Sequence, residues 1–173
     1  TIITKYLENG TLTNFLKSPN LNDTNRQIIL CGISFGMMLL HDHFIIQRDL
    51  KSDNVLLDEN YYPIITDFGT SKVFDPINPT NNTLYRVGTP KYTAPEIFMG
   101  IKYTIKVDVY SFGMLMYEVV TGQRAYSDLT EYENNGFIFN VITQNMRPKT
   151  NNVNNKGLKN MINLVFSLLE TSI

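Results

Sequence analysis

Several features that mark large classes of proteins are scarce in this chain of 173 residues. Cys31 is the only cysteine, so no disulfide can form within the chain and a small disulfide-stabilised fold is excluded. Neither sign of charge is in excess, because 15 lysines and arginines stand against 16 aspartates and glutamates and leave a net charge of −1. Binding to nucleic acid or to an acidic membrane surface usually requires a basic excess, and we therefore predict neither partner.

Long apolar runs are also missing from the sequence. The most apolar stretch, residues 28–40, is interrupted by glycine and serine and is shorter than the roughly 18 to 20 residues that span a bilayer. We expect a buried core helix there, with Cys31 as a small core residue, and no membrane segment in this chain. The lack of an internal disulfide fits a reducing setting. The expected location is the cytoplasm, or the cytosolic face of a membrane if a part outside these residues carries an anchor.

The residues that are present predict one mainly α-helical domain with a small β ribbon. Apolar residues make up 43% of the chain and charged residues 18%, which is ordinary for a globular domain with a core of its own. Periodicity and end signals predict helices at 11–16, from the capping residue Thr24 to about Leu40, at 105–121 between Thr104 and Gly122, and at 158–169. Short strands are expected at 1–5, 55–57 and 63–66. Residues 73–86 are predicted to form a long loop, and residues 123–157 stay unassigned apart from an apolar patch at 137–142.

Two motifs carry most of the chemical information. Residues 47–54 are Gln-Arg-Asp-Leu-Lys-Ser-Asp-Asn, and Asp67-Phe68-Gly69 begins thirteen positions after Asn54. The predicted ribbon places Asn54 and Asp67 at its two ends. Each motif alone could be an ordinary turn, since aspartate and glycine are common turn residues. Their joint order suits phosphoryl transfer, which requires a positioned hydroxyl and charge that neutralises phosphate oxygens.

Together with Ala94-Pro95-Glu96, these motifs resemble those of a eukaryotic protein kinase of the serine/threonine type, closest to the tyrosine-kinase-like branch. The resemblance covers nearly all of residues 1–169 and implies ATP and Mg²⁺ as cofactors and a protein substrate with a serine or threonine acceptor. It implies that Asp49 orients the hydroxyl, that Lys51 contacts the transferred phosphate, and that Asn54 and Asp67 hold Mg²⁺. Lys51 together with Thr89 is typical of serine/threonine kinases.

The same resemblance divides the chain and assigns its nucleotide contacts. Residues 1–10 would be the last strand of the N-terminal lobe and the hinge, and residues 11–173 a helical C-terminal lobe that ends after its penultimate helices. The N-terminal β lobe, with its Gly-rich loop, strand lysine and helix glutamate, would lie upstream. The residues expected at the nucleotide are the gatekeeper Thr4, the hinge residues Lys5 and Leu7, and Leu56 as the floor of the adenine pocket. An ordinary edge strand and turn is the alternative for the first residues.

Further residues are implied to regulate the site or to position the substrate. Arg48 would pair with a phosphate on the loop, for which Thr80 and Thr83 are the candidates, although each could simply be a solvated hydroxyl. Asp108 would anchor the catalytic loop, or be an acid favoured by a helix N-terminus. The remaining residues of this group belong to the motifs themselves and are Phe68, Gly69, Thr89 and Glu96.

The sequence also departs from the kinase pattern. Gln47 replaces the usual histidine, Tyr110 stands where tryptophan is commoner, and no arginine in the chain matches the usual partner of Glu96. Loss of one member of a buried ion pair can cost about 3 to 5 kcal/mol, so the fragment is expected to be poorly stable alone. A pseudokinase or scaffold module remains an alternative. A small-molecule kinase of related fold is a third hypothesis, against which Ala94-Pro95-Glu96 argues. The oligomeric state is not predicted.

Overall fold

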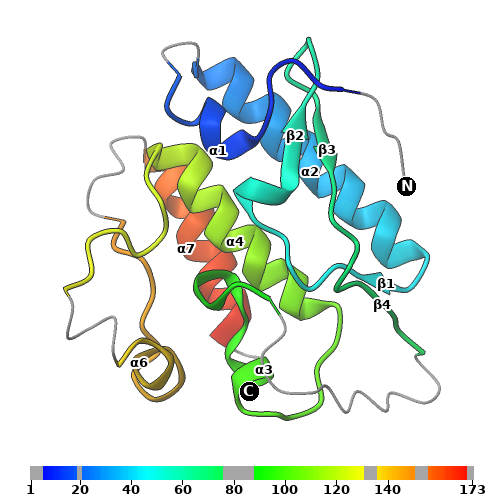
Figure 1. The fold of residues 1–173 in the computed structure, drawn as a ribbon. Helices are drawn as coiled ribbons and strands as arrows, with labels where there is room; N and C mark the ends of the chain where they lie inside the picture. Colours follow the sequence, from blue (N-terminus) through cyan, green and yellow to red (C-terminus); the bar gives the residue numbers. More distant parts are fainter. Residues whose placement is uncertain (1–5, 19–20, 76–87, 131–135, 151–155, 171–173) are drawn as a thin grey trace.

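The computed structural model describes residues 6–18, 21–75, 88–130, 136–150 and 156–170. Its central element is α4, Lys106–Thr121, which packs against α2, Asp23–Asp42, and against α7, Lys156–Glu170 (Figure 1). Most side chains of α4 are buried on all sides, as the nearly continuous apolar sequence predicts. The helix ends at Gly122, whose φ of 70° is the left-handed conformation that glycine adopts without strain. It begins at Lys106, one residue later than expected, and the Thr104 Oγ1 accepts a hydrogen bond from the Lys106 N–H at 3.3 Å.

Helix α2 is amphipathic, which corrects the expectation of a buried core helix. Ile29 and Ile33 are fully buried, whereas Phe35, Cys31 and their neighbours on the opposite face are exposed. The expectation that Cys31 is a core residue is therefore wrong. The reason is geometric, since a residue two positions from both Ile29 and Ile33 lies on the other side of a helix with 3.6 residues per turn.

The start of α2 also differs from the expected one. The N-cap is Asn22, whose side chain accepts a hydrogen bond from the Asn25 N–H at 2.8 Å, so the predicted capping role of Thr24 is wrong. Asparagine is as good an N-cap as threonine, and the helix gains one further half-turn by starting here.

The predicted ribbon is present and lies along α2. Strand β2, Val55–Leu57, pairs antiparallel with β3, Pro63–Ile65, with Val55 opposite Ile65. The ribbon approaches α2 closely because the helix carries glycine where they meet: a Cβ at Gly32 would lie 2.5 Å from Pro63 Cγ. A Cβ at Gly36 would likewise lie 3.0 Å from Ile65 Cδ1, so β3 rests on the glycine face of α2 (Figure 1).

A second strand pair was not predicted. Strand β1, Ile45–Ile46, pairs antiparallel with β4, Lys72–Val73, so the loop expected from residue 73 begins after this strand. Two-residue strands are too short for a period of two to be recognised. The pair matters because it closes the segment between β1 and β4 into one unit that contains both sequence motifs.

The remaining elements are short, apart from α7. The helix expected near 11–16 is α1, Leu12–Phe15, capped by Thr11, and the apolar patch at 137–142 lies in α6, Phe137–Thr143. Helix α3 spans Pro95–Phe98, and 3₁₀ turns occupy Ser52–Asn54 and Pro90–Tyr92. The helix predicted at 158–169 is confirmed as α7, with Ile162 fully buried but Met161 half exposed, so the predicted apolar stripe is not buried throughout. The strand expected at 1–5 lies outside the described residues. Among the residues that the structure describes, no helix is long and apolar enough to cross a bilayer.

Candidate active site

The loop between β1 and β2 carries the first motif and is held in place by the start of α4. Arg48 has a φ of 65°, a left-handed conformation that is unfavourable for a side chain of this size. The Asp108 carboxylate, only 1% exposed, accepts hydrogen bonds from the backbone N–H groups of Gln47 and Arg48, both at 2.9 Å. His41 on α2 lies 2.9 Å from the same carboxylate. Asp108 on α4 is therefore bonded directly to the backbone of the loop.

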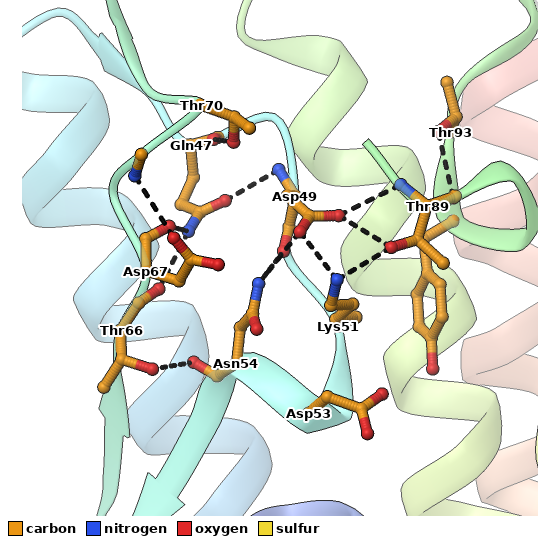
Figure 2. Close-up of polar contacts among 12 residues, drawn as sticks. Gln47, Asp49, Lys51, Asp53, Asn54, Thr66, Asp67, Thr70, Thr89 and Thr93 are labelled. Atoms are coloured by element: carbon orange, nitrogen blue, oxygen red, sulfur yellow. Dashed lines mark hydrogen bonds and ion pairs between the residues drawn. The ribbon is translucent and has the colours of Figure 1, made fainter. Parts of the chain in front are cut away.

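The Asp49 carboxylate lies at the centre of a converging set of donors (Figure 2). Its Oδ1 accepts hydrogen bonds from the Thr89 N–H at 3.0 Å and from the Thr89 hydroxyl at 2.9 Å. Its Oδ2 accepts from Lys51 Nζ at 2.7 Å and from Asn54 Nδ2 at 3.0 Å. Four donors from two segments thus fix the direction of one almost buried carboxylate.

Lys51 and Thr89 complete a triangle with Asp49. Lys51 Nζ donates to the Thr89 Oγ1 at 2.8 Å, in addition to its ion pair with Asp49. The segment of Thr89 can come this close only because Gly88 precedes it: a Cβ at Gly88 would lie 2.8 Å from the Arg48 carbonyl oxygen, and its φ is 96°. The structure therefore brings the Thr89 hydroxyl to the acid and the cation of the first motif, which lie 40 and 38 positions before it in the sequence.

Asp67 follows β3 and lies on the other side of the loop from Thr89 (Figure 2). Its φ is 55°, and the side-chain amide of Gln47 donates hydrogen bonds to the Thr66 carbonyl at 3.0 Å and to the Asp67 carbonyl at 2.8 Å. The Asp67 side chain is exposed, with Oδ1 accepting from the Gly69 N–H at 3.3 Å.

The donor set of Asn54 and Asp67 suits a hard divalent cation. Asn54 Nδ2 donates to the backbone carbonyl and to the carboxylate of Asp49, both at 3.0 Å, so its amide oxygen is the atom left to act as a ligand. An amide oxygen and an accessible carboxylate are oxygen ligands of the kind that Mg²⁺ prefers, with waters and substrate phosphates supplying the rest. These residues fit the metal that the resemblance implied.

A second polar network, which the sequence did not predict, joins the loop to the far end of α4. Glu118 is 1% exposed and accepts hydrogen bonds from the hydroxyls of Ser52 and Tyr92, both at 2.7 Å, and from the Ala125 N–H at 3.0 Å. Burial and the nearby Glu118 charge raise the pKa of the Tyr92 phenol, so it stays a donor. The one available signal was a glutamate inside a helix that is otherwise almost entirely apolar.

Arg124 closes this network at the surface. Its guanidinium forms a two-pronged ion pair with Asp53, with N–O distances of 2.8 and 2.9 Å, and also donates to the Tyr92 hydroxyl at 2.9 Å. The hydrogen bond from Arg124 lowers the pKa of the Asp53 carboxyl. Both side chains are more than two-fifths exposed, so this ion pair contributes little to folding stability. Its main effect is to fix the relative positions of Asp53 and Arg124.

Other predicted residues are placed less directly at the loop. Residues next to Leu7 run beside β2, where the Leu57 N–H donates to the Gly10 carbonyl at 3.0 Å and Thr11 forms a bridge with Leu56. Arg48 Nε donates to the Thr70 carbonyl at 2.6 Å. Phe68 is 47% exposed. Glu96 lies in the first turn of α3, where desolvation raises the pKa of its carboxyl. Four predicted residues lie outside the described ranges: Thr4, Lys5, Thr80 and Thr83.

Comparisons with known proteins agree with this geometry. A family model described as a protein kinase domain matches residues 1–172. A cysteine-rich receptor-like protein kinase of Arabidopsis thaliana is 42% identical over 130 residues, which are 71% of this chain and 20% of that protein. A G-type lectin S-receptor-like serine/threonine-protein kinase of the same plant is 43% identical over 131 residues, which are 71% of this chain and 15% of that protein.

A third relative comes from another organism. The RGS domain-containing serine/threonine-protein kinase A of Dictyostelium discoideum is 38% identical over 149 residues, which are 85% of this chain and 12% of that protein. The chain thus spans at most a fifth of the length of these three relatives.

Proposed function

This chain belongs to the protein kinase family, and we propose that it is the helical lobe of a catalytic domain that transfers the γ-phosphate of ATP to serine or threonine residues of proteins. The observation that supports this most strongly is the triangle of Asp49, Lys51 and Thr89, with Asn54 donating to the same carboxylate. The names of two relatives, both serine/threonine-protein kinases, support the acceptor class. We also propose, on the motifs of the sequence, that the parent belongs to the tyrosine-kinase-like branch.

Each residue of the site has a defined part in the proposed reaction. The γ-phosphoryl group would pass from ATP to the acceptor oxygen as its bond to the β-phosphate oxygen breaks and ADP leaves, and a bound Mg²⁺ would offset charge on the phosphate oxygens. Asp49 accepts the proton of the acceptor hydroxyl and holds its oxygen in line, in the direction that its four donors set. Lys51 places a positive charge beside the acid, where charge on the transferred group develops. Asn54 and Asp67 hold the metal through oxygen atoms.

The flanking segments suit nucleotide and peptide binding. The turn that contains Leu7 lies beside β2, which carries Leu56, so both are suited to contact the adenine in a complete domain. Residues 88–93, which include Thr89, are suited to position the acceptor peptide, because their backbone is tied directly to Asp49. The proposed location is the cytoplasm or the cytosolic side of a membrane, a setting that receptor-like relatives also suggest.

The alternative of a pseudokinase or scaffold module finds no support at Gln47, the described position at which the sequence departs from the kinase catalytic motif. Gln47 departs from the usual histidine, yet its side chain makes three hydrogen bonds within the site. Among the described residues, Asp49, Lys51, Asn54 and Asp67 carry the charged and oxygen-bearing groups that the proposed reaction requires of this segment. An enzyme is therefore the function that the geometry supports best.

The test uses the full-length protein that contains this chain. We expect Asp49→Asn to lower turnover of a serine or threonine peptide by roughly 10²- to 10⁴-fold, because the acceptor oxygen loses its proton acceptor. Nucleotide affinity, measured by calorimetry, should change by less than about threefold, because Asp49 is not a proposed metal ligand. Asp128→Asn is the control, since Asp128 is half exposed and forms a surface pair with Lys149. Unchanged turnover in Asp49→Asn would refute the proposed role.

A further inference from the structure

Gln47 lies between Asp49 and Asp67 and is completely buried (Figure 2). Its amide nitrogen donates to two consecutive carbonyl groups, those of Thr66 and Asp67, at 3.0 and 2.8 Å. Its amide oxygen accepts from the Asp49 N–H at 2.7 Å. The side chain therefore uses both of its N–H donors and its acceptor, and one planar group links the backbone of the proposed base to the backbone of the proposed metal ligand (Figure 2).

The orientation of this amide follows from its partners. A carbonyl can only accept and a backbone N–H can only donate, so the nitrogen must face Thr66 and Asp67 and the oxygen must face Asp49. The backbone of Gln47 is fixed as well, since its N–H donates to Asp108 and its carbonyl accepts from the Thr70 hydroxyl at 3.2 Å. A side chain whose backbone is fixed and whose amide nitrogen and oxygen are both hydrogen-bonded leaves little freedom to the groups that it joins.

We propose that Gln47 is a positioning residue that sets the placement of Asp67 relative to Asp49, an inference that rests on the proposed roles of those two residues. The Gln47 side chain bonds backbone groups and not the side chains proposed to act on substrate or metal. A glutamine can do this more completely than a neutral histidine, which offers one donor and one acceptor and so cannot bond both carbonyls together with the Asp49 N–H. Glutamine at this position thus joins the backbones of Asp49 and Asp67 through hydrogen bonds that a histidine could make only in part. The substitution is therefore no sign of a lost activity.

The connection can be dissected with three variants of the full-length protein. Gln47→Met keeps the approximate size and removes all three hydrogen bonds. Gln47→Glu keeps an oxygen for the Asp49 N–H but loses the donors to Thr66 and Asp67. Gln47→His restores one donor and one acceptor. Gln27→Met is the matched control, because Gln27 is exposed on α2.

Two measurements are needed, one of which requires no catalysis. Hydrogen exchange of the nucleotide-free protein reports on the Asp49 N–H, which should exchange at least about tenfold faster in Gln47→Met and close to the normal rate in Gln47→Glu. Steady-state kinetics should give a kcat roughly tenfold lower in Gln47→Met and a recovery to within about threefold of normal in Gln47→His. In Gln47→Glu, the Mg²⁺ concentration for half-maximal rate should rise by a larger factor than kcat falls.

The outcomes separate this inference from the proposed function. If all variants lower kcat only in proportion to their loss of melting temperature, or if Gln47→Met leaves both the exchange of Asp49 and kcat within twofold of normal, the positioning role is wrong. If Gln47→Met does not fold, the exchange pattern and the Mg²⁺ requirement of Gln47→Glu decide the question by themselves. A parent protein that transfers no phosphate would refute the proposed function, while the exchange data would still test the connection.

Discussion

Two residues of the site are held in backbone conformations that they would not adopt alone. Arg48 and Asp67 have φ values of 65° and 55°, and a left-handed residue other than glycine costs roughly 1 to 2 kcal/mol. Each is restrained by a buried partner, because the Arg48 N–H donates a hydrogen bond to Asp108 and the Gln47 amide donates one to the Asp67 carbonyl. Arg48 directly precedes Asp49, and Asp67 is the proposed metal ligand, so both strained residues lie where a side chain of the proposed site must be aimed.

At the same scale, Thr89 offers a test of the triangle with Asp49 and Lys51. Thr89→Val removes the hydroxyl that bonds both side chains but keeps the size and the backbone N–H. Hydrogen bonds to charged groups are worth about 1.5 to 3 kcal/mol, so we expect kcat to fall by roughly ten- to a hundredfold in the full-length protein. Steady-state kinetics with a saturating peptide measure the effect.

Thr89→Ser is the matched variant for this prediction, since serine keeps the hydroxyl and loses only a methyl group. Its kcat should stay within about threefold of normal. Equal losses in the serine and valine variants would show that keeping the hydroxyl does not preserve turnover, which would contradict the proposed part of Thr89.

At the scale of elements, α4 holds the loop at both ends. Asp108 in its first turn binds the backbone of Gln47 and Arg48, and Glu118 in its last turn binds the hydroxyl of Ser52. The two carboxylates are ten residues apart, about 15 Å along a helix. A rigid helix with a buried acid at each end therefore sets the span of the loop that carries Asp49 and Lys51.

This arrangement predicts large losses of stability from either acid. Asp108→Ala leaves two backbone N–H groups without their acceptor, and Glu118→Ala does the same to two hydroxyls and one N–H, so each should lower the free energy of unfolding of the catalytic domain by roughly 2 to 4 kcal/mol. Urea unfolding followed by circular dichroism measures the change. Asp128→Ala, at an exposed pair, should cost less than about 1 kcal/mol. If Asp108→Ala or Glu118→Ala lowered the free energy of unfolding no more than this control does, the proposal that α4 holds the loop at both ends would be contradicted.

Local signals were sufficient for the elements that frame the site but not for the contacts inside it. Gly122 and the apolar sequence before it predicted α4, and the motifs predicted that Asp49, Lys51 and Asn54 would lie together. The exposed position of Cys31 was missed because composition was considered without helical phase. The contacts of Gln47 and Glu118 join segments up to 66 positions apart, and no local pattern specifies such partners.

At the scale of the whole molecule, the site is assembled from segments that meet on one side of α4. The ribbon and its flanking motifs rest on α2, the segment with Thr89 follows β4 by more than a dozen residues, and both converge on the loop before β2 (Figures 1 and 2). Because nucleotide and metal would bind across these segments, ligand binding should stabilise the folded protein as a unit.

The last prediction concerns this coupling between Mg-ATP and stability in the full-length protein. A ligand at a hundred times its Kd stabilises the folded state by about 2.7 kcal/mol, which for a domain of this kind corresponds to an increase in Tm of roughly 5 °C or more. Removing the metal with EDTA should abolish most of that increase. Asp67→Asn should behave with Mg-ATP as the unaltered protein does with ATP and EDTA, because the one charged member of the two proposed oxygen ligands has lost its charge.

Thermal unfolding with and without EDTA distinguishes this loss from a general destabilisation. Asp67 is exposed, so Asp67→Asn should leave the Tm of the ligand-free protein within about 2 °C of normal, and only the Mg-dependent increase should disappear. Asp23→Asn is the control, since Asp23 is an exposed acid at the start of α2 and should keep the whole increase. A full Mg-dependent increase in Asp67→Asn would mean that the metal is held by other residues, and the assignment of Asp67 would have to be withdrawn.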